Sequence, residues 1–114
     1  MIVMSNQKVE YTEGGGNVYQ DIGFSDAEER MAKARLALRI EAIIEERGLK
    51  QVEAAKILGI NQPKISALMN GRLSGFAMER LIHFLNLLNQ NVEIVVTSRP
   101  GRHKSHGHLK VAFG

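Results

Sequence analysis

Apolar residues recur at helical spacing from residue 25 onward, and they predict a long first helix from Ser25 to Arg47. Ser25 and Glu28 have the spacing of a capping box at its start, and Gly48 follows its last turn. The apolar positions of this expected helix form one stripe: Leu36, Ile40, Ile43 and Ile44. The stripe indicates one buried face and one solvent-exposed face.

The stretch Gln51–Met69 predicts two short helices joined by a tight turn. Gly59 can adopt positive φ at this turn, and Ala55 is small where the two helices must approach. Pro63 fits the first turn of the second short helix, where its missing N–H would be unpaired anyway. Four apolar residues would hold the angle between the helices: Leu58, Ile60, Ile65 and Leu68. A second helix displayed in this way can enter the major groove of DNA.

The pattern changes twice after the hairpin. Residues 76–89 predict a helix that is apolar around much of its circumference, which indicates burial on two sides, the second side being another subunit. Residues 91–99 are rich in β-branched residues and predict a strand, which needs a partner strand to be stable. We therefore expect a homodimer with Leu85, Leu88 and Ile94 at or next to its interface.

The two ends of the chain differ from the helical centre. Residues 1–16 have little periodicity and contain three consecutive glycines, so a flexible N-terminal arm is expected there. Residues 17–24 are unusually apolar for a linker, which favours either docking on the helical core or a patch that binds a partner: Val18, Tyr19, Ile22 and Phe24. Residues 100–114 are rich in Gly, His and Lys and predict a flexible basic tail, which leaves one domain over residues 17–99.

Charge is distributed unevenly over the 114 residues, although the net charge is only +3. Residues 1–47 contain six Lys and Arg against nine Asp and Glu, whereas both later parts of the chain have a basic excess that suits a phosphate backbone. The sequence contains no Cys and neither a membrane-spanning apolar run nor the pattern of a signal peptide. A cytoplasmic protein is expected.

The stretch Gln51–Met69 resembles the helix-turn-helix of Cro/C1-type (XRE) repressors, in which Ala55 and Gly59 occupy the small-residue positions. The longer run Leu58–Leu85 resembles the XRE-type proteins, HigA-like antitoxins, that are often encoded beside a RelE/HigE-like toxin. The resemblance covers residues 17–99. It implies a mainly α, lambda-repressor-like bundle, with the C-terminal β-strand paired across a dimer.

The expected DNA contacts divide into base reading and backbone positioning. Gln62 can bind adenine, Lys64 can donate to guanine or meet a phosphate, and Ala67 can contact a thymine methyl group. The full set of expected base-contacting residues is Gln62, Lys64, Ser66 and Ala67. The expected backbone-contacting residues are Lys50, Gln51, Asn61, Asn70 and Arg72.

Two of these positions are particular to this sequence. The resemblance maps a backbone-binding glutamine onto Gln51 and the first base-contacting positions onto Gln62 and Pro63, but Pro63 has no side-chain hydrogen-bonding group. Lys50 stands where related sequences often have Thr or Ser. Because Lys cannot accept the backbone N–H bonds of a helix start, the missing cap should weaken the second helix by about 1 kcal/mol.

Catalysis is not expected, because the sequence has no Gly-rich phosphate loop, no nucleophile motif and no paired carboxylates near a His in the expected core. His103, His106 and His108 could bind Zn²⁺ or Ni²⁺, but no Cys or carboxylate lies nearby, so adventitious binding is the expected reading. We therefore expect no cofactor and no physiological metal site.

The resulting functional hypothesis is a sequence-specific DNA-binding repressor, acting as the autorepressing antitoxin of a type II toxin–antitoxin pair. Its partners would be a double-stranded DNA operator and a RelE/HigE-like toxin that contacts the acidic leading part of the chain through the apolar patch at residues 18–24. Two alternatives stay open. In the first, the chain is a stand-alone XRE-type repressor without a toxin. In the second, it is a module whose helical hairpin binds only protein.

Overall fold

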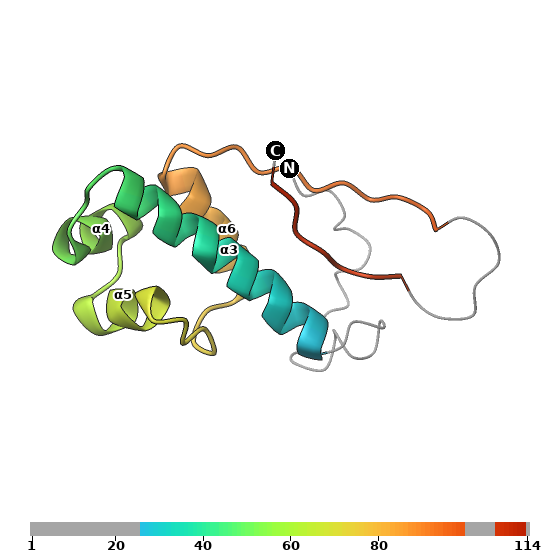
Figure 1. The fold of residues 1–114 in the computed structure, drawn as a ribbon, viewed down its shortest axis with the longest axis horizontal. Coiled ribbons are helices and arrows are strands. Elements are labelled where there is room, and N and C mark those ends of the chain that lie inside the picture. The colour runs from blue at the N-terminus through green and yellow to red at the C-terminus, as the bar shows by residue number, and fades with distance from the viewer. Residues whose placement is uncertain (1–25, 100–106, 114) are drawn as a thin grey trace.

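The computed structural model describes residues 26–99 and 107–113, and this part of the chain contains four helices (Figure 1). They are α3 (Asp26–Glu46), α4 (Gln51–Leu58), α5 (Gln62–Met69) and α6 (Met78–Leu87). Each predicted helix is present, and α3, α4 and α5 have nearly the predicted bounds. The last helix is shorter than predicted, since residues 76, 77, 88 and 89 lie outside it. The mainly helical fold class is confirmed.

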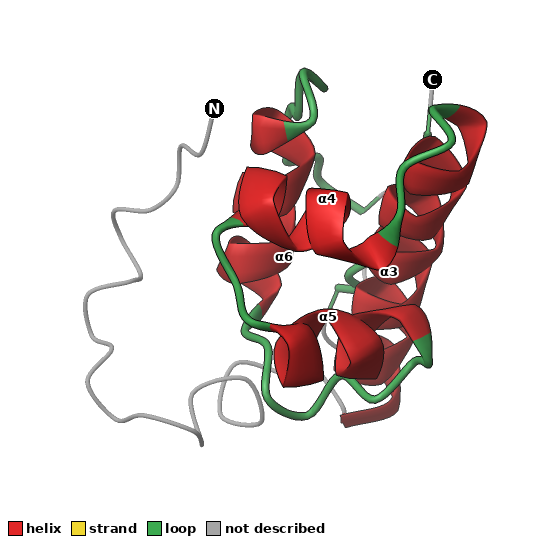
Figure 2. Ribbon diagram, turned by 90° about the vertical axis from the view of Figure 1, so that its left-hand side faces the viewer, coloured by secondary structure: helices red, strands yellow, loops and turns green. Residues whose placement is uncertain are grey.

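The four helices enclose one apolar core. The helix α3 packs against α6 and α4 packs against α5, and Figure 2, viewed from the left-hand side of Figure 1, shows α4 and α5 in front of the α3–α6 pair. None of the described residues that are buried has a polar or charged side chain. The largest fully buried side chains are Phe76, Phe84, Ile40, Ile44, Ile65, Leu81 and Leu88. The rings of Phe76 and Phe84 meet edge to face at a centroid distance of 5.9 Å, which anchors the loop before α6 to the core.

The turn between α4 and α5 has the predicted geometry. Gly59 adopts φ +72° and its N–H donates to the Lys56 carbonyl at 3.3 Å, while the Ile60 N–H donates to the Ala55 carbonyl at 3.0 Å. These two bonds form the Schellman motif and pair carbonyls that the helix end would otherwise leave unbonded. Residues with positive φ also end the other three helices: Gly48, Gly71 and Asn89. The angle between α4 and α5 is thus set by backbone bonds as well as by apolar packing.

The start of α4 is capped from one side only. Lys50 makes no side-chain cap bond, as predicted, because an ammonium group has no acceptor. Its backbone N–H donates to the Glu53 Oε1 atom at 2.8 Å, so Glu53 supplies half of a capping box. The other half, a side-chain acceptor at position 50, is missing.

The chain beyond α6 is extended. Residues 91–99 do not form a β-strand with any other described segment, so the predicted strand is not formed within this single chain. Val92 and Ile94 are half-buried, whereas Val95 and Val96 are 74% and 78% exposed. The strand and its pairing across a dimer therefore stay predictions, since a strand needs a partner strand for its backbone groups.

Two residues that the sequence placed at a subunit interface are buried inside the chain itself. Leu85 is 3% exposed and Leu88 is fully buried, and both belong to the core between α3 and α6. Their side chains are therefore not available to a second subunit. Among the large apolar residues of α6, Leu87 is the exposed one, at 39%.

Part of the predicted flexible tail lies against α3. The His108 Nδ1 atom is 2.6 Å from the Glu28 carboxylate, and Val111 packs on the apolar core. The Phe113 ring lies beneath two guanidinium groups, with the Arg35 and Arg39 Cζ atoms 5.6 and 5.8 Å from its centroid. Residues 107–113 have apolar and aromatic side chains that can cover α3, and the overall Gly- and Lys-rich composition of the tail concealed them.

Several sequence predictions lie outside the described residues. They are the arm at residues 1–16, the helix cap at Ser25, His103 and His106, and the apolar patch of Val18, Tyr19, Ile22 and Phe24. Among the helices of the described part, none combines the length and the apolar character needed to cross a bilayer.

Candidate nucleic-acid interface

The helix α5 has one buried side and one side that faces solvent. Ile65 and Leu68 are 0% and 2% exposed and attach the helix to the core. At its start, the Asn61 Oδ1 atom accepts a hydrogen bond from the Lys64 backbone N–H at 3.0 Å, and Pro63 occupies the first turn. Asn61 is thus the N-cap of α5, which fixes its side-chain oxygen but leaves its amide nitrogen free of that bond.

A polar stripe runs along the solvent side of α5. Gln62, Ser66 and Asn70 follow one another at four-residue spacing, so they lie on one face of the helix. The Asn70 Nδ2 atom donates to the Ser66 carbonyl at 2.9 Å and lies 3.5 Å from the Ser66 hydroxyl. Gln62 is exposed at the N-terminal end of this stripe. Its amide is therefore the group of the stripe best placed to bind a base edge.

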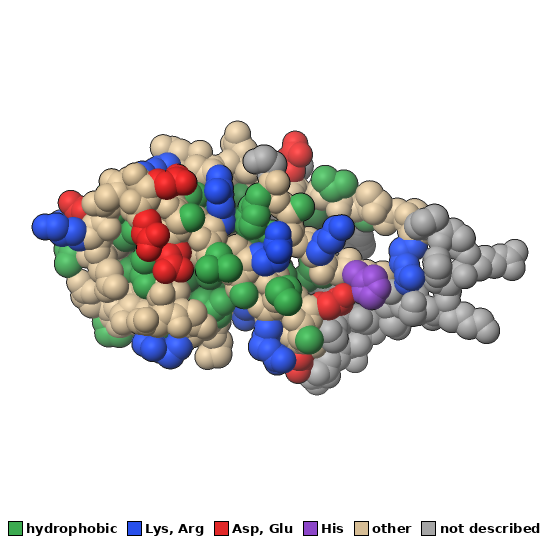
Figure 3. All heavy atoms as spheres, viewed as in Figure 1, with side chains coloured by type: hydrophobic (Ala, Val, Ile, Leu, Met, Phe, Trp, Pro, Cys, Tyr) green, Lys and Arg blue, Asp and Glu red, His purple; other side chains and the backbone are tan. Residues whose placement is uncertain are grey.

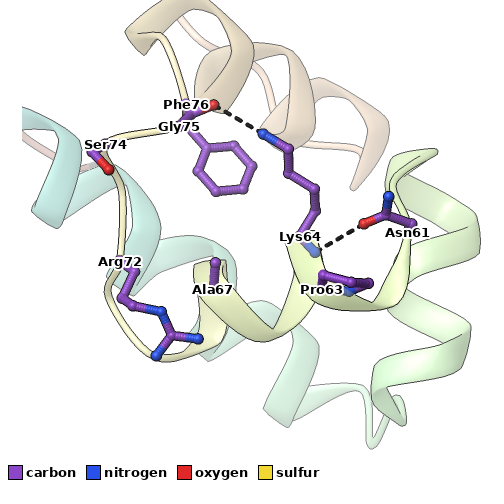
Figure 4. Close-up of a pocket in the computed structure, with 8 residues that line it drawn as sticks. All are labelled: Asn61, Pro63, Lys64, Ala67, Arg72, Ser74, Gly75 and Phe76. Carbon is purple, nitrogen blue, oxygen red and sulfur yellow. Dashed lines mark hydrogen bonds between the residues drawn. The ribbon is translucent and has the colours of Figure 1, made fainter.

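A second, apolar stripe lies beside the first. Pro63 is exposed and Ala67 half-exposed, one helical turn apart, and both line a shallow hollow beside α5 (Figure 4). The two stripes together form the outward surface of α5; none of their residues is fully buried, although Ala67 also packs against the edge of the core. A surface of this kind can offer a base both hydrogen bonds and contact with a methyl group.

Lys64 does not extend into solvent as its predicted role would require. Its Nζ atom donates to the Gly75 carbonyl at 3.2 Å and lies 4.8 Å from the centroid of the Phe76 ring. Figure 4 shows the side chain crossing the hollow from α5 to the loop that precedes α6. The structure therefore groups Lys64 with this loop rather than with Gln62.

The hollow joins predicted residues to others that the sequence did not indicate. Its lining consists of Asn61, Pro63, Lys64, Ala67, Arg72, Ser74, Gly75 and Phe76. Ser74, Gly75 and Phe76 were not predicted, since a backbone carbonyl such as that of Gly75 has no signal in residue type. Arg72 is exposed, and its backbone N–H donates to the Ala67 carbonyl at 2.9 Å, which holds the start of the loop against α5.

The predicted backbone-contacting residues flank α5. Lys50 and Gln51 lie at the start of α4, which packs on α5, while Asn61 and Asn70 lie at the two ends of α5. All of them are exposed, as is Arg72. Exposed amide and guanidinium donors around a helix that faces outward suit oxygen atoms of a phosphate backbone.

The helix α3 carries both acidic and basic side chains, although residues 1–47 as a whole have an acidic excess. Acidic residues occupy its first turn and its last part, and basic residues lie between them: Arg30, Lys33, Arg35 and Arg39. The face drawn in Figure 3 shows acidic side chains gathered over the C-terminal half of α3 and basic ones along its middle. The described part of the acidic leading region is thus mixed in charge.

Comparison with known proteins supports the interpretation of α4 and α5. A family model described as a helix-turn-helix domain matches residues 18–97. A solved structure, whose name gives it as a candidate XRE family transcriptional regulator, is 48% identical in sequence and has a TM-score of 0.72. The match covers 79% of this chain and 100% of that one. No curated protein sequence matches.

Proposed function

The chain belongs to the XRE-type helix-turn-helix family and is a DNA-binding transcriptional regulator, and on that basis we propose that it represses its own operon as the antitoxin of a type II toxin–antitoxin pair. The observation that carries the DNA-binding part is the outward surface of α5, where a polar and an apolar stripe contain no fully buried residue. The antitoxin part rests on the resemblance of residues 58–85 to HigA-like proteins.

Sequence-specific contact would come from α5. Gln62 would bind an adenine through its amide, while Ser66 and Ala67, one turn further along, would contact the next bases. Lys50, Gln51, Asn61, Asn70 and Arg72 would donate to phosphates and so fix the position of the helix in the groove. Gln62 and the five backbone-contacting residues are exposed, and Ser66 and Ala67 are half-buried, which supports both roles.

Two copies of the chain would bind one operator. Helix-turn-helix dimers bind two half-sites about 34–36 Å apart. A dimer therefore makes twice as many contacts with the operator as a single recognition helix would. The extended residues 91–99 have exposed Val95 and Val96 and would pair with the same segment of the second copy, with Ile94 beside the interface. Leu87 would be the contribution of α6 in place of Leu85 and Leu88, because only Leu87 among the three is exposed.

The toxin would be a small RelE/HigE-like mRNA interferase. We propose that it contacts the leading part of the chain, where Val18, Tyr19, Ile22 and Phe24 supply an apolar patch among acidic residues. This arrangement leaves α5 free, so that toxin and operator would bind at the same time.

Co-expression with the product of the neighbouring reading frame tests the antitoxin role. We expect the full-length chain to restore growth that this product arrests, and to co-purify with it. Tyr19→Ser together with Phe24→Ser should abolish rescue but preserve DNA binding, whereas Leu38→Ser, at a 64% exposed position of α3, serves as a matched surface control. Full rescue by the double variant would move the toxin surface elsewhere, and a neighbouring product without toxicity would favour a stand-alone repressor.

Selection of binding sites from a randomised pool of duplexes tests the DNA-binding specificity. A protein that reads sequence should enrich one motif, arranged as two half-sites, and its affinity should fall as the salt concentration rises. Failure to enrich any motif would leave the protein-only interaction module as the better reading of the hairpin.

A further inference from the structure

The ammonium group of Lys64 has two contacts, and both lie on the loop that follows α5. Its Nζ atom is 3.2 Å from the Gly75 carbonyl and 4.8 Å from the Phe76 ring centroid. Phe76 is only 1% exposed and its ring meets Phe84 in the core, so the aromatic side of this contact is held in place. Lys64 therefore joins α5 to the end of the loop at which the Phe76 ring is anchored in the core.

Gly75 leaves the room that this contact requires. A Cβ atom at residue 75 would lie 3.2 Å from the Lys64 Nζ atom, closer than most such contacts in proteins. The ammonium thus occupies the space beside Gly75 that a side chain would otherwise fill. The aliphatic stem of Lys64 crosses the hollow to reach it (Figure 4).

The loop between α5 and α6 is tied to α5 at two places. At its start, the Gly71 and Arg72 backbone N–H groups donate to the Leu68 and Ala67 carbonyls at 3.2 and 2.9 Å. At its far end, Lys64 is the tie, through the Gly75 carbonyl. The exposed residues Arg72 and Ser74 lie between these two ties.

We propose that Lys64 is a positioning residue, which fixes the loop carrying Arg72 beside the recognition helix so that Arg72 meets a phosphate, and that it does not read a base. This inference rests on the proposed DNA-binding surface and deepens it. The Lys64 ammonium stays on Gly75 and Phe76 when DNA binds, and the sequence is read by Gln62 and its neighbours. Lys64 acts on affinity through Arg72.

A double-mutant cycle tests this role with the duplex that the full-length protein selects from a randomised pool. The variants are Lys64→Met, which keeps the aliphatic stem, Lys64→Arg, which keeps a cation able to stack on Phe76, Arg72→Ala, and the double variant K64M/R72A. Lys110→Met removes the same charge from the segment that lies along α3, away from the hollow, and is the control for net charge.

If Lys64 positions Arg72, its substitution should weaken binding to all duplexes alike, and the size of the effect should depend on the presence of Arg72. Lys64→Met should weaken binding about fivefold for the selected duplex and for each of its single-base variants alike, since it removes one charge-assisted contact. Lys64→Arg should restore affinity to within about twofold, because Arg also donates and stacks on aromatic rings. In a protein that already carries Arg72→Ala, Lys64→Met should have little further effect.

Four results would overturn the proposal. If Lys64→Met weakened binding only where one guanine is present, Lys64 would read that base. If the losses in affinity from Lys64→Met and Arg72→Ala were additive, Lys64 would not act through Arg72. If Lys110→Met weakened binding as much as Lys64→Met, the effect would come from net charge alone. Failure of Arg72→Ala to weaken binding would remove the contact that Lys64 is proposed to position. If no duplex is selected at all, the proposed DNA-reading function itself fails, which is distinguishable from each of these results.

Discussion

Arg47 and Leu88, 41 positions apart in the sequence, are joined by a hydrogen bond of 2.6 Å from the Arg47 Nη2 atom to the Leu88 carbonyl oxygen. Arg47 directly follows α3 and Leu88 directly follows α6, so the bond ties together the C-terminal ends of the two helices that pack on each other. The Leu88 carbonyl also accepts from the Gln90 Nε2 atom at 3.2 Å. This contact fixes the place where the extended residues 91–99 leave the helical core.

Arg47→Met should lower the free energy of unfolding by about 1 kcal/mol, because the Leu88 carbonyl loses one of its two donors. Urea unfolding of the full-length protein measures this change. Arg47→Lys is the matched control. It keeps the charge, but a shorter, compact ammonium does not have the guanidinium fork, so we expect partial recovery. Equal stability for Arg47→Met and the unsubstituted protein would show that water replaces the bond at no cost.

Gln62→Ala should weaken binding to the selected duplex by about 1–3 kcal/mol and relax preference at one base pair in each half-site. Arg72→Ala should instead weaken binding to all sequences alike and reduce the dependence of affinity on salt. Binding measured against single-base variants of the duplex, at two or more salt concentrations, separates the two effects. Uniform loss for Gln62→Ala would remove it from the base-reading set.

Lys50→Ser should raise the free energy of unfolding by about 1 kcal/mol, because a hydroxyl group at this position can accept the backbone N–H of Glu53 and complete the capping box. Glu53 already accepts the N–H of residue 50, so the other half of the box is in place. Thermal unfolding compares this variant with Lys50→Ala, which removes the same side chain without adding an acceptor and should give no such gain. If Lys50 also meets a phosphate, Lys50→Ser will weaken DNA binding while it stabilises the fold.

Val111→Ala should lower the free energy of unfolding by about 1 kcal/mol, because Val111 packs on the apolar core from outside α3. Val52→Ala removes the same atoms from a side chain of α4 that is 53% exposed, and it should change stability by less than about 0.5 kcal/mol. Denaturant unfolding of the two variants side by side makes the comparison. Equal, negligible effects would indicate that residues 107–113 contribute nothing to the stability of the fold.

The helices were predictable because each carries its own boundary signals. Gly48, Gly59 and Gly71 each follow a helix and adopt the positive φ that ends it, so the sequence placed these ends within about two residues. The last helix was predicted too long by two residues at each end. Phe76 and Leu88 have the apolar spacing of the helix and are buried, but they belong to the turns that flank it.

Apolar periodicity shows which residues avoid water but not what covers them. Leu85 and Leu88 were therefore assigned to a dimer interface, although α3 and the rest of the core bury them within one chain. The same limit applies to Val111, whose contact with the core depends on the path of a tail that has no periodicity at all.

The sequence indicated that Gln62 and Ser66 lie outside the core on α5, but it did not indicate where the Lys64 side chain would lie. A lysine has a long stem, and its ammonium can reach partners far along the chain, here a carbonyl 11 residues away. Backbone carbonyls and buried rings are the partners in this case, and neither is marked by a motif. The sequence therefore did not predict the hollow beside α5.

The turn at Gly59 has a consequence for handedness. Apart from Gly59 and its two chain neighbours, no described residue has an atom within 4 Å of the place where a side-chain Cβ would be added, so lack of space is not the reason for a glycine here. It is required because φ is +72°, which costs an L-amino acid about 1–2 kcal/mol. Asn89 meets the same demand at φ +67° with a side chain present. The requirement at residue 59 is therefore chiral, and a mirror-image D-residue, for which positive φ is the ordinary region, would match the backbone of this turn better than any L-residue with a side chain.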